Sequence, residues 1–284
     1  MKLIALKVKL ILSAVIMLQL LGCSNDTEEE FDWSNNGVKV EKGRVIAFFP
    51  KDSVSEERMN ELVDSLNIGI EATLRYMGGP YQWQVFGDRP VTYYFEPGNF
   101  VSVTDIEGDI YIPLFRIQSN QAPWLHETMH ALLRNKGGNW NERSQVTLYF
   151  SMPIWLTEGM AEYLAVKVAA EDSIQKFDLM KSGGYYKVDA SCYKSLTENE
   201  ALLSYMGEPG IPTRLLTNRK EFAPPFYNCA CSFAKYLSET YGLNTMLTAI
   251  SSFQKEMETI ESLTGKNMET LRTEWVAKIK PASR

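Results

Sequence analysis

The sequence is short of basic residues, histidine and long hydrophobic runs. Lysine and arginine total 29 against 35 aspartates and glutamates, which gives a formal net charge of −6. Because binding to nucleic-acid phosphates needs clustered lysine and arginine, we expect no nucleic-acid partner. With 18 glycines and 12 prolines among 284 residues, the chain is neither collagen-like nor of low complexity. Its hydrophobic fraction of 45% is enough to build a folded core.

The longest apolar run lies close to the N-terminus, at residues 10–21. It has about twelve residues where a membrane span needs roughly twenty, so it is too short to cross a bilayer. Lysines precede it, and it ends in Leu20-Leu21-Gly22-Cys23, which resembles a bacterial lipobox. The pattern predicts a lipoprotein signal peptide over residues 1–22, with Cys23 as the lipidated first residue of the mature chain. An uncleaved anchor helix and an ordinary secretory cleavage are the alternatives.

Residues 23–37 are polar and acidic, which predicts a solvated tether behind the lipid anchor. The acidic run resembles the surface-export signals of some Gram-negative lipoproteins, and a plain spacer is the alternative. We therefore expect a protein of the bacterial cell envelope, attached to the outer membrane through Cys23. If the acidic run is an export signal, the protein faces the cell surface.

Three further cysteines remain, which is an odd number: Cys192, Cys229 and Cys231. A disulfide from Cys192 to one of the other two agrees with export. Three small buried thiols agree with the sequence equally well. Cys229 and Cys231 are two apart in a helical pattern, so they point to different sides and are not expected to pair with each other.

Strand-like and helix-like patterns divide the mature chain into a mixed first part and a mostly helical second part. Strand patterns occur at 43–49, 91–95, 100–103 and 109–114, and a helix pattern at 53–77. Further helix patterns occur at 122–135, 154–170, 227–241, 244–254 and 268–279. The sequence therefore predicts an α+β fold, in which a small mixed sheet with a helix (38–120) packs on a mostly helical unit (121–284).

Both histidines of the chain lie in one motif, His126-Glu127-Thr128-Met129-His130. On a helix, residues four apart lie on one face, one turn from each other, so both imidazoles point at the same place. Two such ligands suit a tetrahedral Zn²⁺, and Glu127 beside them is placed to act as a general base. A pair of solvent-facing helix histidines is the alternative.

A zinc site of this kind needs a third protein ligand, and no third histidine exists. Glu158 and Glu162 stand one turn apart in a segment that is otherwise largely apolar. Because carboxylates in apolar surroundings usually have a partner, we predict Glu158 as the third ligand. We predict that Glu162 accepts a hydrogen bond from a ligating imidazole and fixes its tautomer. A solvated acidic face is the alternative.

HETMH (126–130) followed by WLTEGMAEYLA (155–165) resembles the gluzincin zinc metallopeptidases, which include thermolysin and the aminopeptidase N type. PFYNCACSFAKYLSETYG (225–242) and ESLTGKNMETLRTEW (261–275) are similar to later segments of the aminopeptidase N-like members. The resemblance implies a zincin-like catalytic unit over 121–284. It also implies that His126, His130 and Glu158 bind zinc, that Glu127 is the general base and acid, and that Tyr227 donates to the oxyanion. A packed core tyrosine is the alternative for Tyr227.

The sequence departs from the aminopeptidase pattern in one informative way. It has no Gly-x-Met-Glu-Asn signature, with which aminopeptidases of this type hold a free N-terminus. GDIYIP (108–113) occupies the place of the family's edge strand, which could pair with an extended peptide; an ordinary sheet strand is the alternative. We therefore expect zinc-dependent cleavage of peptide or protein substrates, more as an endopeptidase than as an aminopeptidase. A non-catalytic surface lipoprotein that binds a glycan or a protein is the alternative.

Overall fold

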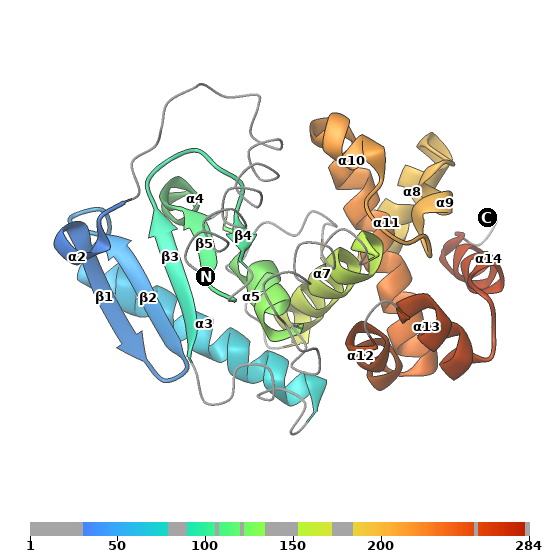
Figure 1. Cartoon of the computed structure of the whole chain (residues 1–284), viewed down its shortest axis with the longest axis horizontal. Coiled ribbons are helices and arrows are strands. Elements are labelled where there is room, and N and C mark those ends of the chain that lie inside the picture. The colour runs from blue at the N-terminus through green and yellow to red at the C-terminus, as the bar shows by residue number, and fades with distance from the viewer. Residues whose placement is uncertain are drawn as a thin grey trace, which may run out of the picture.

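The computed structural model describes residues 31–78, 90–105, 108–119, 122–133, 153–171, 184–252 and 255–281. The predicted signal peptide and Cys23 lie outside these residues, so lipidation and membrane attachment stay predictions. Among the helices so described, none combines the length and the apolarity that crossing a membrane requires. A sheet with one long helix forms one end of the molecule and a group of helices forms the other (Figure 1). The predicted α+β class is confirmed.

Within the described residues, one mixed sheet has five strands. In spatial order these are β1 (Gly37–Lys42), β2 (Val45–Pro50), β3 (Val91–Glu96), β5 (Ile110–Pro113) and β4 (Val103–Thr104). The pairs β2–β3 and β3–β5 are parallel, whereas β1–β2 and β4–β5 are antiparallel. Along β3, Val91, Tyr93 and Phe95 are buried and alternate with half-buried residues. One face of the sheet therefore carries the core.

Three of the predicted strands are present, but two details of the sheet differ from the expectation. Residues 100–102 lie outside any strand, and β4 covers only Val103–Thr104. β1 was not expected, because its valines alternate with charged residues and the strand stays half-exposed at one edge of the sheet.

The segment 108–113, expected at the edge, lies inside the sheet. A hairpin folds β4 back onto β5, so that Thr104 pairs with Ile110. Gly108, with a φ of 89°, lies in the connecting turn, a conformation that favours glycine. The described edge strand next to the helical half is therefore β4, and the prediction for β5 is wrong.

The long helix α3 (Glu56–Met77) packs against β1, β2 and the first helices of the second half. Its predicted span is confirmed except for the first residues. The start is set by Ser55, whose side chain accepts a hydrogen bond from the backbone N–H of Arg58. Gly78 ends the helix with a φ of 81°.

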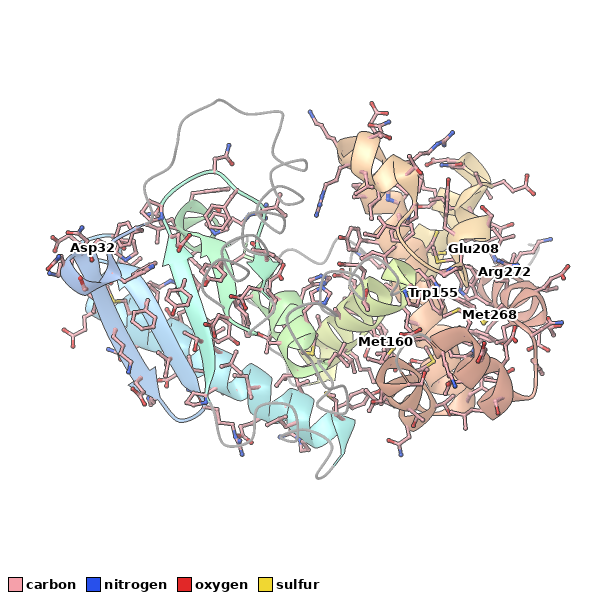
Figure 2. All side chains as sticks on the ribbon, viewed as in Figure 1. Asp32, Trp155, Met160, Glu208, Met268 and Arg272 are labelled. Atoms are coloured by element: carbon pink, nitrogen blue, oxygen red, sulfur yellow. The ribbon has the colours of Figure 1, made fainter. Side chains whose placement is uncertain are left out.

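In the helical half, α5 (Trp124–Leu133), α7 (Ile154–Glu171) and α11 (Arg219–Tyr241) pack in sequence, with α7 between the other two. The remaining helices are α2 (Trp33–Asn36), α4 (Leu114–Gln118), α8 (Val188–Glu198), α9 (Leu202–Tyr205), α10 (Thr213–Thr217), α12 (Leu243–Ser251), α13 (Glu256–Thr264) and α14 (Met268–Ile279). Arg272 of α14 donates to the Met206 carbonyl and lies 3.9 Å from the Glu208 carboxylate (Figure 2). The last helix is thereby tied to the segment after α9.

Helix α11 starts earlier than its sequence indicates. The helix pattern of the sequence begins at residue 227, after Pro224 and Pro225, yet both prolines lie inside the helix, which begins at Arg219. Each proline removes one backbone donor. The buried side chains of Phe222 and Phe226 hold this part of the helix against the core. Packing therefore outweighs the local preference of the proline pair.

Candidate metal centre

The two histidines project from the same face of α5, as their spacing predicts. Their Nε2 atoms are 3.0 Å apart. His126 is 6% exposed, and α7 packs against the helix that carries it. A pair of solvent-facing histidines, the alternative drawn from the sequence, does not match this burial.

Glu158 reaches the two imidazoles from α7. Its Oε2 lies 3.2 Å from Nε2 of His126 and 3.5 Å from Nε2 of His130. Ligand atoms around a tetrahedral zinc, at bonds of about 2.0–2.1 Å, are about 3.3 Å apart. The three donor atoms therefore have the spacing of three corners of a zinc coordination tetrahedron, and these residues fit the ion. They form the candidate metal cluster among the described residues.

Glu162, one turn after Glu158, determines which atom of His126 faces the cluster. Its Oε2 lies 2.8 Å from Nδ1 of His126, and its side chain is almost fully buried. The Nδ1–H donates to this carboxylate, so the neutral ring presents a lone pair at Nε2. That lone pair faces the carboxylate of Glu158, and two electron-rich atoms at this distance need a cation between them. The donor set thus calls for a metal ion or a proton.

The charges around His126 favour a proton at this place when no metal ion is bound. Burial lowers the pKa of His126, but hydrogen bonds and charges from Glu158 and Glu162 outweigh burial and raise it to about 10. Burial raises the pKa of Glu158, but the two imidazoles outweigh this and hold it well below its usual value. A metal ion that binds here must therefore displace a proton.

Glu127 lies on α5 between the two histidines and is 6% exposed. The hydroxyl of Thr104, on the edge strand β4, lies 3.1 Å from its Oε2 and 3.0 Å from its backbone carbonyl. Burial lowers the pKa of Arg116, and the negative charge of Glu127 opposes this effect, which places Arg116 within its electrostatic reach. No motif marks Thr104 or Arg116, so sequence reasoning missed both. Thr104 lies on β4 and Arg116 on α4, so only the tertiary fold brings them near Glu127.

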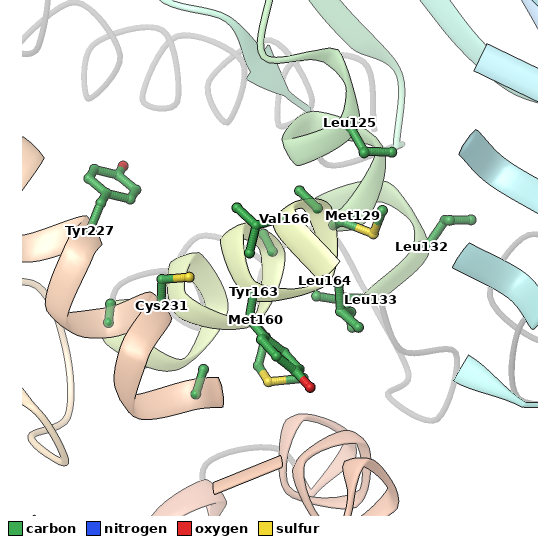
Figure 3. Packing of buried hydrophobic residues seen from close by; sticks show 14 of the residues in the cluster. Leu125, Met129, Leu132, Leu133, Met160, Tyr163, Leu164, Val166, Tyr227 and Cys231 are labelled. Carbon is green, nitrogen blue, oxygen red and sulfur yellow. The ribbon is translucent and has the colours of Figure 1, made fainter. Parts of the chain in front are cut away.

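Tyr227 comes to the site from α11. Its ring centroid is 6.1 Å from that of His126, at an interplanar angle of 65°, and the side chain is 4% exposed. Figure 3 shows Tyr227 projecting from α11. The phenol belongs to the wall of the metal centre, and its role there stays a prediction.

A glycine allows α7 and α11 to approach each other at this point. A Cβ added to Gly159 would lie 2.4 Å from the backbone oxygen of Ala230. Only a residue without a side chain permits this contact. Gly159 follows Glu158 directly, and Ala230 is three residues after Tyr227, so the contact sets the distance between both parts of the site.

No protein-family profile matches the sequence, and no curated protein matches it. Among solved structures, the chain is similar to a two-domain M1 zinc metallopeptidase variant bound to L-tryptophan, at 14% identity and a TM-score of 0.42. It is also similar to a variant of the M1 zinc metallopeptidase from Deinococcus radiodurans, at 16% identity and a TM-score of 0.43. The matches cover 87% of this chain and 52% and 53% of those chains, so it spans about half their length.

Proposed function

We propose that the protein hydrolyses peptide bonds with a zinc ion held by His126, His130 and Glu158. The observation that supports this most directly is the convergence of three donor atoms from two helices at 3.0–3.5 Å from one another, with a buried glutamate on the same helix turn. Zinc, when bound, supplies Lewis acidity, which acidifies water and polarises a substrate carbonyl.

Glu127 is the residue that moves the proton in this proposal. The Thr104 hydroxyl donates a hydrogen bond to Oε2 of Glu127. In this proposal, Oε1 takes a proton from the attacking water. The same carboxyl then returns the proton to the leaving amine. The Thr104 contact also fixes the side chain, so that Oε1 keeps one orientation through both transfers.

Glu162 and Tyr227 support the reaction from two sides. Glu162 keeps the proton of His126 on Nδ1, so that Nε2 stays a donor of electrons to the metal. The Tyr227 ring lies beside the His126 ring, and in this proposal its phenol donates a hydrogen bond to the oxygen on which charge develops. Their positions beside His126 support both assignments.

The substrate class in this proposal is an extended peptide or a protein. The two-residue strand β4 is the described sheet edge beside α5, and such an edge can bind a peptide backbone. The missing aminopeptidase signature favours internal cleavage over removal of N-terminal residues. A lipid at Cys23 would hold this activity at the bacterial outer membrane, which is the location that we propose.

The test compares residues 24–284, which leave out the predicted lipidated Cys23, with their Glu127→Gln variant, after zinc loading. We expect one equivalent of zinc in both proteins and cleavage of casein or of a peptide library by the parent alone. Glu258→Gln, an exposed change of the same kind on α13, is the matched control and should cleave like the parent. Equal cleavage by parent and Glu127→Gln would refute the proposal. Zinc binding without any cleavage, together with binding on a glycan array, would favour the non-catalytic alternative.

A further inference from the structure

Two thiols outside the metal centre face each other across the interface of α8 and α11. The Sγ atoms of Cys192 and Cys229 are 3.3 Å apart, and both side chains are fully buried. We infer that Cys192 and Cys229 form a disulfide bond that joins α8 to α11 when the protein folds under oxidising conditions. This inference does not depend on the proposed function.

The geometry requires little movement. A disulfide has an S–S length of about 2.0 Å, so the two sulfur atoms must approach by roughly 1.3 Å, which side-chain rotation can supply. The Cys192 thiol is directed at the Cys229 sulfur, and the Cys229 thiol lies 3.9 Å from the Cys192 carbonyl. Cysteines that point away from each other could not show these contacts.

Cys231 is not the partner, which resolves the choice that the sequence leaves open. Residues two apart on a helix are about 200° apart around its axis, so Cys229 and Cys231 face different neighbours. Figure 3 shows Cys231 projecting from α11 toward α7, whereas Cys229 faces Cys192 on α8. The pair is therefore Cys192–Cys229, with Cys231 left as a thiol.

Formation of the bond removes two protons and two electrons from the two thiols. A small disulfide, or the disulfide of a protein oxidant, accepts them and is itself reduced to two thiols. Burial raises the pKa of the Cys192 thiol, so the reactive thiolate is disfavoured in the folded core. The bond therefore forms while the chain is folding, and afterwards the core shields it from reductants.

The crosslink would reinforce an interface that is already polar and specific. Asp189 on α8 accepts hydrogen bonds from Ser232 and from Lys235 on α11, at 2.8 and 2.6 Å. A disulfide at Cys229 adds a covalent link on the same helix. It lies shortly after Pro224 and Pro225, which have no backbone N–H to donate a hydrogen bond. The disulfide thus anchors α11 four residues after Pro225 and two residues after Tyr227. Because it joins residues 37 apart, it also restricts the unfolded chain substantially.

The experiment refolds the full chain in a glutathione redox buffer, alkylates free thiols under denaturing conditions, and maps peptides by mass spectrometry. We expect a peptide in which Cys192 is joined to Cys229 and Cys231 is alkylated. Fragment ions from cleavage on either side of Ala230 will show which of Cys229 and Cys231 carries the link. Cys231→Ala should keep the link, and Cys229→Ala should abolish it. Alkylation of Cys192, Cys229 and Cys231 together in the refolded parent, or a link to Cys231, would overturn the inference. Because the parent is mapped directly, a variant that fails to fold leaves the test intact.

Thermal unfolding gives a second readout. Reduction of the linked protein should lower its Tm by roughly 10 °C, given a loop of this length in a chain of this size. The reduced parent and the reduced Cys231→Ala variant should unfold alike. An unchanged Tm after complete reduction would show that the bond does not hold α8 and α11 together. Neither readout involves zinc or catalysis, so failure here and failure of the proposed function are separate results.

Discussion

Replacement of Gly159 by alanine tests how the contact between α7 and α11 shapes the site. In an ordinary helix this change stabilises the protein by about 1 kcal/mol, because glycine is a poor helix former. Here the new Cβ would lie 2.4 Å from the Ala230 oxygen. Carbon–oxygen contacts are about 3.3 Å or longer, so the helices must separate by about 1 Å.

Separation of packed helices costs about 1–3 kcal/mol, which exceeds the gain in helix propensity. We therefore expect Gly159→Ala to unfold about 2–4 °C below the parent, for a net loss near 1 kcal/mol. The His126, His130 and Glu158 donors lie on α5 and α7, so zinc content should not change. Tyr227 moves with α11, and a misplacement of this size reduces a catalytic rate by about tenfold or more.

The assay combines thermal unfolding, zinc analysis and kcat for peptide cleavage. Met160→Leu, a change of similar volume at the next position of α7, is the matched control and should keep both zinc and kcat. A higher Tm and an unaltered kcat in Gly159→Ala would refute the reasoning. Such a result would mean that α11 does not approach α7 as closely as the structure shows.

Three further predictions concern the metal centre itself. Glu162→Gln should weaken zinc binding by about 10–100-fold, since a neutral amide replaces the carboxylate that orients His126; an unchanged dissociation constant in a competition titration would contradict this role. Tyr227→Phe should lower kcat and leave KM nearly unchanged. Equal turnover by the variant and the parent would show that the Tyr227 hydroxyl does not take part in catalysis. Zinc binding at neutral pH should release about one proton, because His126 keeps its proton up to a pKa of about 10 in the metal-free protein, so the apparent affinity rises with pH. Calorimetry in two buffers of different ionisation enthalpy measures this release, and identical heats would exclude it.

The local parts of the fold and of the site could be read from the sequence. The helix α3 has capping residues at both ends and apolar residues at helical spacing, so its own sequence defines it. The histidine pair is equally local, because a four-residue spacing places two side chains on one helix face in almost any context. These features depend on bonds within a single element.

Other parts depended on neighbours that are distant in the chain. The β1 strand and the true edge strand β4 carry mixed, polar sequences, and only pairing with β2 and β5 makes them strands. The early start of α11 depends on the packing of Phe222 and Phe226, which outweighs two prolines. Local propensity could not indicate either result.

The sequence by itself determined that two imidazoles and a glutamate share one turn of one helix. The tertiary structure alone decided how far Glu158 lies from them, that Thr104 holds Glu127, and that Cys192 faces Cys229 rather than Cys231. The physical reason is that a spacing along a helix sets directions only within that helix. Distances between helices are set by the packing of side chains. Between α7 and α11 the distance is short because Gly159 has no side chain.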